Sequence, residues 1–208
     1  MKKGLMIGLM GAMTLVACNQ EKEKVEDQFN YTVEQFADLQ LLRFKVHGFE
    51  ELPLKQKELV YYLSEAALQG RDILFDQNGK YNLIIRKMLE VVYTDYQGDR
   101  SDANFKNFET YLKRVWFSNG IHHHYAADKF VPGFTPEFFK SALKSVDASK
   151  LPLMEGETLD ALCKAVFPVI FDAKVMAKRV NQADGEDLVL TSASNYYEGV
   201  THKEAEDF

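Results

Sequence analysis

The sequence contains few of the residues and motifs on which small exported domains and metalloenzymes depend. It has two cysteines, and one of them, Cys18, belongs to the N-terminal signal described below. Cys163 is then without a partner for an intramolecular disulfide, so stability must come from packing, and its place in an apolar helical pattern indicates a buried thiol. The sequence has no H-E-x-x-H pair, no C-x-x-C pair, no glycine-rich phosphate loop and no Ser-His-Asp signature.

Positive charge is also scarce. The 208 residues include 25 lysines and arginines against 31 acidic residues, which gives a formal net charge of −6. Residues 1–17 hold two of the basic residues and none of the acidic ones, so their removal changes the net charge to −8. Because nucleic-acid binding depends on neutralising phosphates, this balance argues against a nucleic-acid partner.

The N-terminus has the pattern of a bacterial lipoprotein signal. A basic start precedes an apolar run that is too short to anchor in a membrane, and residues 15–18 read L-V-A-C. This pattern predicts a signal peptide over residues 1–17 and lipidation of Cys18, with an ordinary secretory signal as the alternative. Residues 18–29 form a charged tether, and residues 30–208 are long enough for one domain with a core. We expect an exported protein that contacts a bacterial membrane through its lipid anchor only.

Hydrophobic periodicity predicts a mainly α chain with a minor β part. The first helix is expected over residues 31–44, where Thr32 and Gln35 have the spacing of a capping box. Residues 187–192, D-L-V-L-T-S, are the one stretch that looks like a strand. Further helices are expected over residues 53–70, 81–96, 101–119, 135–146 and 158–167, with a short one after Asp172.

The C-terminus predicts one more helix. Thr201 and Glu204 again have capping-box spacing, and the sequence ends before the helix would be complete. We therefore expect further chain after Phe208.

Three consecutive histidines lie in residues 118–130, S-N-G-I-H-H-H-Y-A-A-D-K-F. In a strand or in a helix, at most two of the three can face one ion. A zinc site needs three or four protein ligands, and the nearby candidates are Tyr125 and Asp128. We therefore expect a rigid, aromatic-lined loop whose imidazoles bond to the backbone or line a cleft. A metal held by His122 and His124 stays open as the alternative, and the candidate cleft-lining residues are His122, His123, His124 and Tyr125.

Three segments resemble the N-terminal portion of the bacterial dipeptidyl-peptidase III family. They span residues 58–90, 111–138 and 176–201, and the block W-F-S-N-G-I-H-H-H-Y, residues 116–125, is the most specific part of the resemblance. The resemblance implies a zinc aminopeptidase-type enzyme that removes dipeptides from the N-termini of short peptides. It also implies two lobes around a wide cleft, of which this chain forms the helical part of one.

The catalytic residues of that family have no counterpart here. The family holds zinc with an H-E-x-x-x-H pair and a downstream glutamate, and the glutamate of the motif activates water; neither occurs in this sequence. The resemblance therefore implies that zinc, catalysis and the remaining lobe belong to a longer protein, and that this chain alone binds no cofactor. The alternative is a freestanding helical lipoprotein that binds a peptide or a protein without catalysis.

The lipoprotein signal gives the first testable prediction. Cys18→Ser removes the thiol that would receive the lipid, so we expect the signal peptide to stay attached and labelling by a clickable fatty acid to be lost. The measurement is in-gel fluorescence after metabolic labelling, with Cys163→Ser as the matched control that should label like the wild type. Equal labelling of the Cys18→Ser variant would contradict the prediction.

Overall fold

The computed structural model describes residues 29–208, and the expected signal peptide, Cys18 and the tether up to residue 28 lie outside them. Within the described residues the chain is mainly helical with one two-stranded antiparallel sheet, which confirms the expected fold class. In chain order the elements are β1 (Thr32–Phe36), β2 (Leu39–Leu42), α1 (Leu54–Gln69), α2 (Arg71–Asn78), α3 (Asn82–Asp95), α4 (Ala103–Ser118), α5 (Pro136–Ser145), the 3-10 turn η1 (Ala148–Lys150), α6 (Leu159–Phe171), α7 (Leu188–Thr191) and α8 (His202–Asp207).

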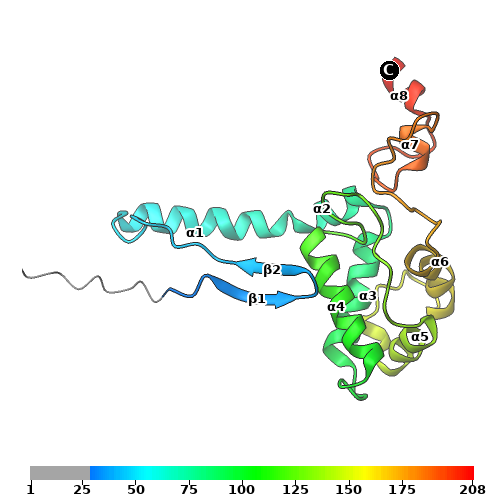
Figure 1. Cartoon of the computed structure of the whole chain (residues 1–208), viewed down its shortest axis with the longest axis horizontal. Helices are drawn as coiled ribbons and strands as arrows, with labels where there is room; N and C mark the ends of the chain where they lie inside the picture. The colour runs from blue at the N-terminus through cyan, green and yellow to red at the C-terminus, as the bar shows by residue number, and fades with distance from the viewer. Residues whose placement is uncertain (1–28) are drawn as a thin grey trace, which may run out of the picture.

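The elements form a packed body with two extensions (Figure 1). Helices α3 to α6 gather into the body, and α2 leads into it from one side. The β1–β2 hairpin and α1 extend from the body in the same direction in Figure 1, and we call these three elements the arm. Helices α7 and α8 project at another end, where the chain reaches its C-terminus. No helix within residues 29–208 is both long enough and apolar enough to cross a bilayer.

The core of the body is built around aromatic rings. Phe108 of α4 is fully buried, and its ring centroid lies 5.6 Å from that of Phe134 and 6.0 Å from that of Phe139. Apolar residues from α3 and α6, such as Leu89 and Val166, complete this single cluster. Burial of large apolar side chains is the main favourable contribution to folding, so the stability of the protein is concentrated in the body.

Several helix ends follow the sequence signals. Asp102 caps α4 by accepting a hydrogen bond from the Asn104 amide, and α4 ends at Asn119 in the left-handed conformation. Thr135 and Thr158 cap α5 and α6 in the same way. The capping box predicted for Thr201 is present at the start of α8. Side-chain caps can be predicted from the sequence because they join residues only two or three positions apart.

The helix expected over residues 31–44 is wrong, because this segment is the β1–β2 hairpin. A two-residue turn at Ala37 and Asp38 reverses the chain, with Ala37 at φ 49°, and Phe36 pairs with Leu39 across it. The segment has an apolar residue at every third position. In so short a segment this spacing does not distinguish a helix from a hairpin. Lys113 and Arg114 of α4 form ion pairs with Glu34 and Asp38 of the hairpin. Tertiary contacts therefore decide the conformation of this segment.

Three further expectations are corrected around the helices. Residues 187–192 were expected as a strand but contain the single-turn helix α7, since no neighbouring strand is available there to pair with. Residues 173–176, expected to be helical, form consecutive turns. The helix expected over residues 53–70 is followed directly by a second helix, α2, which the sequence pattern did not predict. The chain can continue into α2 because Gly70 itself has helical dihedral angles.

The C-terminal extension depends on the carboxylate of Asp187. This side chain accepts hydrogen bonds from the amides of Val189 and Leu190 at the start of α7, and from the amide of His202 at the start of α8. The bonds from these backbone amides, with that of Leu190 the largest, lower the pKa of the Asp187 carboxyl. One side chain therefore caps two helices.

We predict that Asp187→Ala speeds the hydrogen exchange of the Val189, Leu190 and His202 amides, because all three lose an acceptor. Asp187→Asn is the matched control, since it keeps one carbonyl oxygen and should protect them partly. The lowered pKa means that the contribution of Asp187 is complete above the unfolded value of about 3.9 and is lost as the pH falls through the folded value. NMR exchange rates check this, and unchanged protection in Asp187→Ala would contradict it.

Candidate functional site

The three histidines lie on a short irregular hairpin that follows α4, and we call residues 121–130 the histidine loop. The Phe130 amide donates to the Ile121 carbonyl at 2.8 Å, and the His123 amide donates to the Asp128 carbonyl at 2.7 Å. Ala127 closes the turn at φ 60° and donates its amide to the His123 carbonyl at 3.0 Å. The loop is thus held by hydrogen bonds within its own backbone.

Two other segments extend this backbone ladder. The Lys129 amide donates to the Ala177 carbonyl, and the Arg179 amide donates to the Ala127 carbonyl at 2.9 Å. On the far side of residues 177–179, the amides of residues 193 and 194 donate to the carbonyls of residues 178 and 179. The Asn195 amide then reaches the Gln77 carbonyl at the end of α2. The histidine loop therefore lies where α2, α4 and the chain after α6 meet.

His122 is the buried histidine, with 2% of its surface exposed. Its Nε2 lies 2.7 Å from the Met176 carbonyl oxygen, which can only accept, so Nε2 carries the proton and donates. Burial lowers the pKa of His122, the charges of Lys129 and Arg179 lower it further, and the bond to Met176 opposes the shift. The lowered pKa favours the neutral form of His122, whose Nδ1 is buried without a hydrogen-bond partner.

His123 and His124 are half-buried and stack on each other, with ring centroids 4.6 Å apart and an interplanar angle of 21°. The Nδ1 of His123 accepts hydrogen bonds from the amides of Tyr125 and Ala126. His124 packs against the edge of Phe117 and against Tyr125, which is 85% exposed. Desolvation, His123 and Arg179 together lower the pKa of His124. Two of the three imidazoles thus bond to backbone, and the outer rings form an aromatic surface.

The metal alternative is not assembled by these side chains. His122 directs Nε2 to a backbone carbonyl, whereas the ring of His124 is stacked among aromatic neighbours. Asp128, the nearest acidic candidate, is paired with Lys178. Among residues 29–208 there is no group of three or more histidine, cysteine or acidic side chains that could hold a metal ion.

Asn82 and Arg179 are the residues at this site that sequence reasoning missed. The Oδ1 of buried Asn82 accepts a hydrogen bond from the Ile121 amide at 3.2 Å. Arg179 donates to the His124 carbonyl at 3.0 Å and to Oδ1 of Asn78 at 3.3 Å. The sequence offers one signal for this junction, the Asn-Gly dipeptides at residues 78–79 and 119–120. The two turns meet here through the hydrogen bond from Asn78 to the Asn119 carbonyl.

Lys129 fastens the other side of the loop to the end of α6. Its ammonium donates to the Val169 carbonyl at 3.0 Å and also to the carbonyls of Asp172 and Val175. Burial lowers the pKa of Lys129, while the charge of Asp172 opposes the shift. The Val169 carbonyl belongs to the last turn of α6, and those of Asp172 and Val175 to the chain that follows, so the lysine joins the loop to both.

The turn of the β1–β2 hairpin reaches the same region. Asp38 forms an ion pair with Arg114, whose guanidinium lies 5.4 Å from the ring centroid of Phe130. A backbone hydrogen bond, followed by the charge of Arg114 and a smaller contribution from His123, lowers the pKa of Asp38. The arm is thus attached to the body beside the histidine loop.

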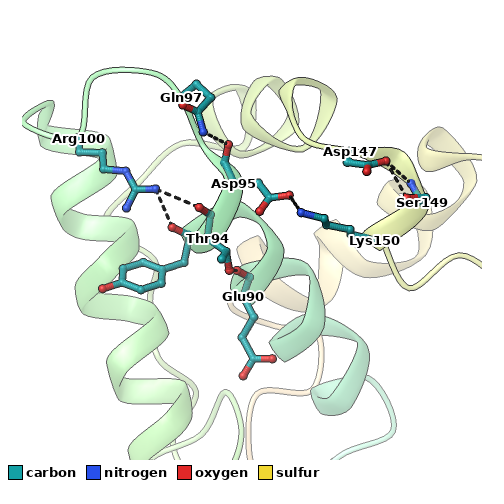
Figure 2. A network of polar contacts seen from close by, with 9 residues as sticks. Glu90, Thr94, Asp95, Gln97, Arg100, Asp147, Ser149 and Lys150 are labelled. Carbon is teal, nitrogen blue, oxygen red and sulfur yellow. Dashed lines mark hydrogen bonds and ion pairs between the residues drawn. The ribbon is translucent and has the colours of Figure 1, made fainter.

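A second polar cluster, at the far end of α3, is structural (Figure 2). Arg100 donates from Nη2 to the carbonyls of Tyr93, Thr94 and Tyr96, which are left open where α3 ends. Lys150 pairs with Asp95 at 2.6 Å and so ties η1 to α3. These contacts satisfy a helix end and join two elements of the body.

Comparison with known proteins identifies no relative. No protein-family model matches the chain, and a search of the curated proteins found no match. The site itself offers a surface of imidazole and phenol rings, formed by His123, His124 and Tyr125.

We predict that His122 makes the stability of the protein depend on pH. Its pKa is lowered in the folded state, so the unfolded chain binds a proton first and stability should fall as the pH drops below about 6.5. His122→Gln can still donate to the Met176 carbonyl but does not titrate, so its melting temperature should fall less between about pH 7 and about pH 5. Differential scanning calorimetry makes the measurement, with His47→Gln on the exposed arm as control. An equally steep decline in His122→Gln would contradict the prediction.

Proposed function

We propose that this chain is the N-terminal part of an exported, lipid-anchored zinc dipeptidyl-peptidase that resembles the bacterial dipeptidyl-peptidase III family. Under this proposal the full-length enzyme releases dipeptides from the N-termini of short peptides. The residues that hold zinc and activate water belong to the remaining lobe, and this chain forms one side of the cleft. When bound there, zinc would polarise the scissile carbonyl and lower the pKa of a water molecule.

The observation that carries the proposal is the exposure of the arm. Helix α1 has 16 residues, all within the described part of the chain, and none of them is buried. Leu59, Tyr62 and Leu63 are among its large exposed apolar side chains. A two-stranded hairpin is only marginally stable by itself. Large apolar surfaces that are exposed on a folded protein usually mark a contact site. An arm of this kind fits a lobe that is completed by more protein.

The histidine loop suits one wall of a peptide cleft. Its backbone is hydrogen-bonded to residues 177–179 and to the side chain of Asn82, and its outer face presents His123, His124 and exposed Tyr125. A rigid support is what a substrate-positioning surface requires, since small displacements cost binding and rate. The loop also coincides with the most specific block of the family resemblance, residues 116–125.

A second candidate function is a freestanding lipoprotein that binds a peptide or protein without catalysis. A cavity of about 240 Å³ in the C-terminal extension favours it, because apolar and aromatic side chains line it together with two serines. Its size suits an apolar side chain. The lining residues are Val180, Leu188, Val189, Ser192, Ser194, Tyr196 and Tyr197. Reading the gene beyond Phe208 separates the two functions, since the peptidase requires an H-E-x-x-x-H motif there.

We predict that the mature chain, residues 18–208, releases no dipeptide from a dipeptidyl-arylamide substrate, with or without added zinc. The physical reason is that its described residues hold no group of zinc ligands and its sequence no general-base motif. The chain extended through the downstream reading frame should release the dipeptide in a chelator-sensitive way, and its variant with the motif glutamate replaced by glutamine is the control. Chelator-sensitive release by residues 18–208 alone would contradict the assignment of catalysis to the remaining lobe.

A further inference from the structure

The end of the arm that lies farthest from the body has an unusual surface, and we call residues 43–54 the tip. The tip connects β2 to α1, and β1 begins beside it, so the chain from residue 28 enters the described structure at this end (Figure 1). Phe44 is 76% exposed, Val46 is 67% exposed and Leu54 is 71% exposed. The tip therefore presents several large apolar side chains to solvent where the tether arrives.

The shape of the tip is held by its own hydrogen bonds. The Phe49 amide donates to the Val46 carbonyl, and the Glu51 amide donates to the carbonyl of Gly48, which has φ 83°. Lys57 of α1 donates to the Glu50 carbonyl across the loop. These hydrogen bonds hold the backbone of the turn. Phe44 and Val46 are therefore exposed on a folded loop.

Basic residues surround the apolar side chains of the tip. Arg43, Lys45, Lys55 and Lys57 lie in or next to it, against the acidic Glu50, Glu51 and Glu58. These four basic residues slightly outnumber the three acidic ones, whereas the mature chain as a whole is acidic. Apolar side chains flanked by lysine and arginine are the combination found on surfaces that enter the lipid interface, where the cationic groups extend toward the headgroups.

The length of the tether places this surface next to the bilayer. Ten residues, Asn19 to Gln28, separate Cys18 from Phe29. Ten residues span at most about 35 Å when fully extended, and a random coil of that length has a root-mean-square span of about 18 Å. A surface tethered so closely meets the membrane at a high effective concentration, so even a weak contact is populated.

We propose that the tip is a membrane-contacting surface, whose apolar side chains enter the lipid interface beside the anchor and hold the body away from the bilayer. This proposal rests on the lipoprotein part of the proposed function. It changes the expectation that the membrane is contacted through the lipid anchor only. The bilayer is favoured over a second copy or another protein because the tip is the end of the arm that the anchor chain reaches first.

A single-tryptophan experiment tests the proposal. Phe44→Trp is combined with Trp116→Phe, so that the only tryptophan lies in the tip, and Cys18 of the mature chain is coupled to a maleimide lipid. Cys163 is buried and should not react. On phosphatidylethanolamine and phosphatidylglycerol vesicles, the emission of the variant should shift to shorter wavelength and lose most of its intensity when brominated lipids are included.

The wild-type protein is the matched control, because its Trp116 lies on α4 in the body and is held by a hydrogen bond to Glu90. Its emission should be unchanged on the same vesicles. If Phe44→Trp fails to fold, judged by circular dichroism, Val46→Trp in the same background replaces it.

Two results would overturn the proposal. Emission of the folded tip variant that is the same on brominated vesicles and in solution would show that the tip does not touch lipid. A short-wavelength emission that is present without vesicles and is lost on dilution would show that a second copy covers the tip. Since the coupling is chemical, failure of lipidation in the cell would remove the anchor proposal without altering either readout.

Discussion

The position of the histidine loop depends on one close approach, between the backbone at Gly120 and the side chain of Asn82. A Cβ atom at Gly120 would lie 2.5 Å from Nδ2 of Asn82, and Gly120 has φ 151°, so only glycine fits there without displacing the amide. The same side chain accepts the Ile121 amide, which sets the direction in which the chain leaves α4. The contacts of His122, Lys129 and Arg179 all follow from that direction.

The free energy of folding is distributed unevenly between the body and the arm. The body contains the whole cluster of buried apolar residues, in which rings from α4, α5 and α6 pack on α3. The hairpin is attached to α4 by Lys113 and Glu34 and by Arg114 and Asp38, which are partly exposed ion pairs. Ion pairs that are exposed to solvent contribute little to stability. The arm is therefore the part whose stability depends most on what it contacts.

This division is consistent with two roles for the arm in the proposed enzyme. The apolar side chains along α1 offer a surface for the remaining lobe, and the tip offers a surface for lipid beside the anchor. The loop of histidines lies at the other end, where the hairpin turn meets α4. An arm with its tip at the membrane would present the body, and with it the wall of the cleft, away from the bilayer.

The sequence by itself determined the helical class and several helix ends, because side-chain caps and glycine stops act over a few residues. Thr135 with Pro136 and Asn119 with Gly120 are examples that hold in the structure. Only the tertiary structure decided that residues 31–44 form a hairpin and that residues 188–191 form a helix, since pairing partners and long-range ion pairs set both. It also decided the site. Tertiary packing buries His122, and Met176, 54 residues away, supplies the acceptor for its Nε2. Arg179 joins two turns that no local pattern connects.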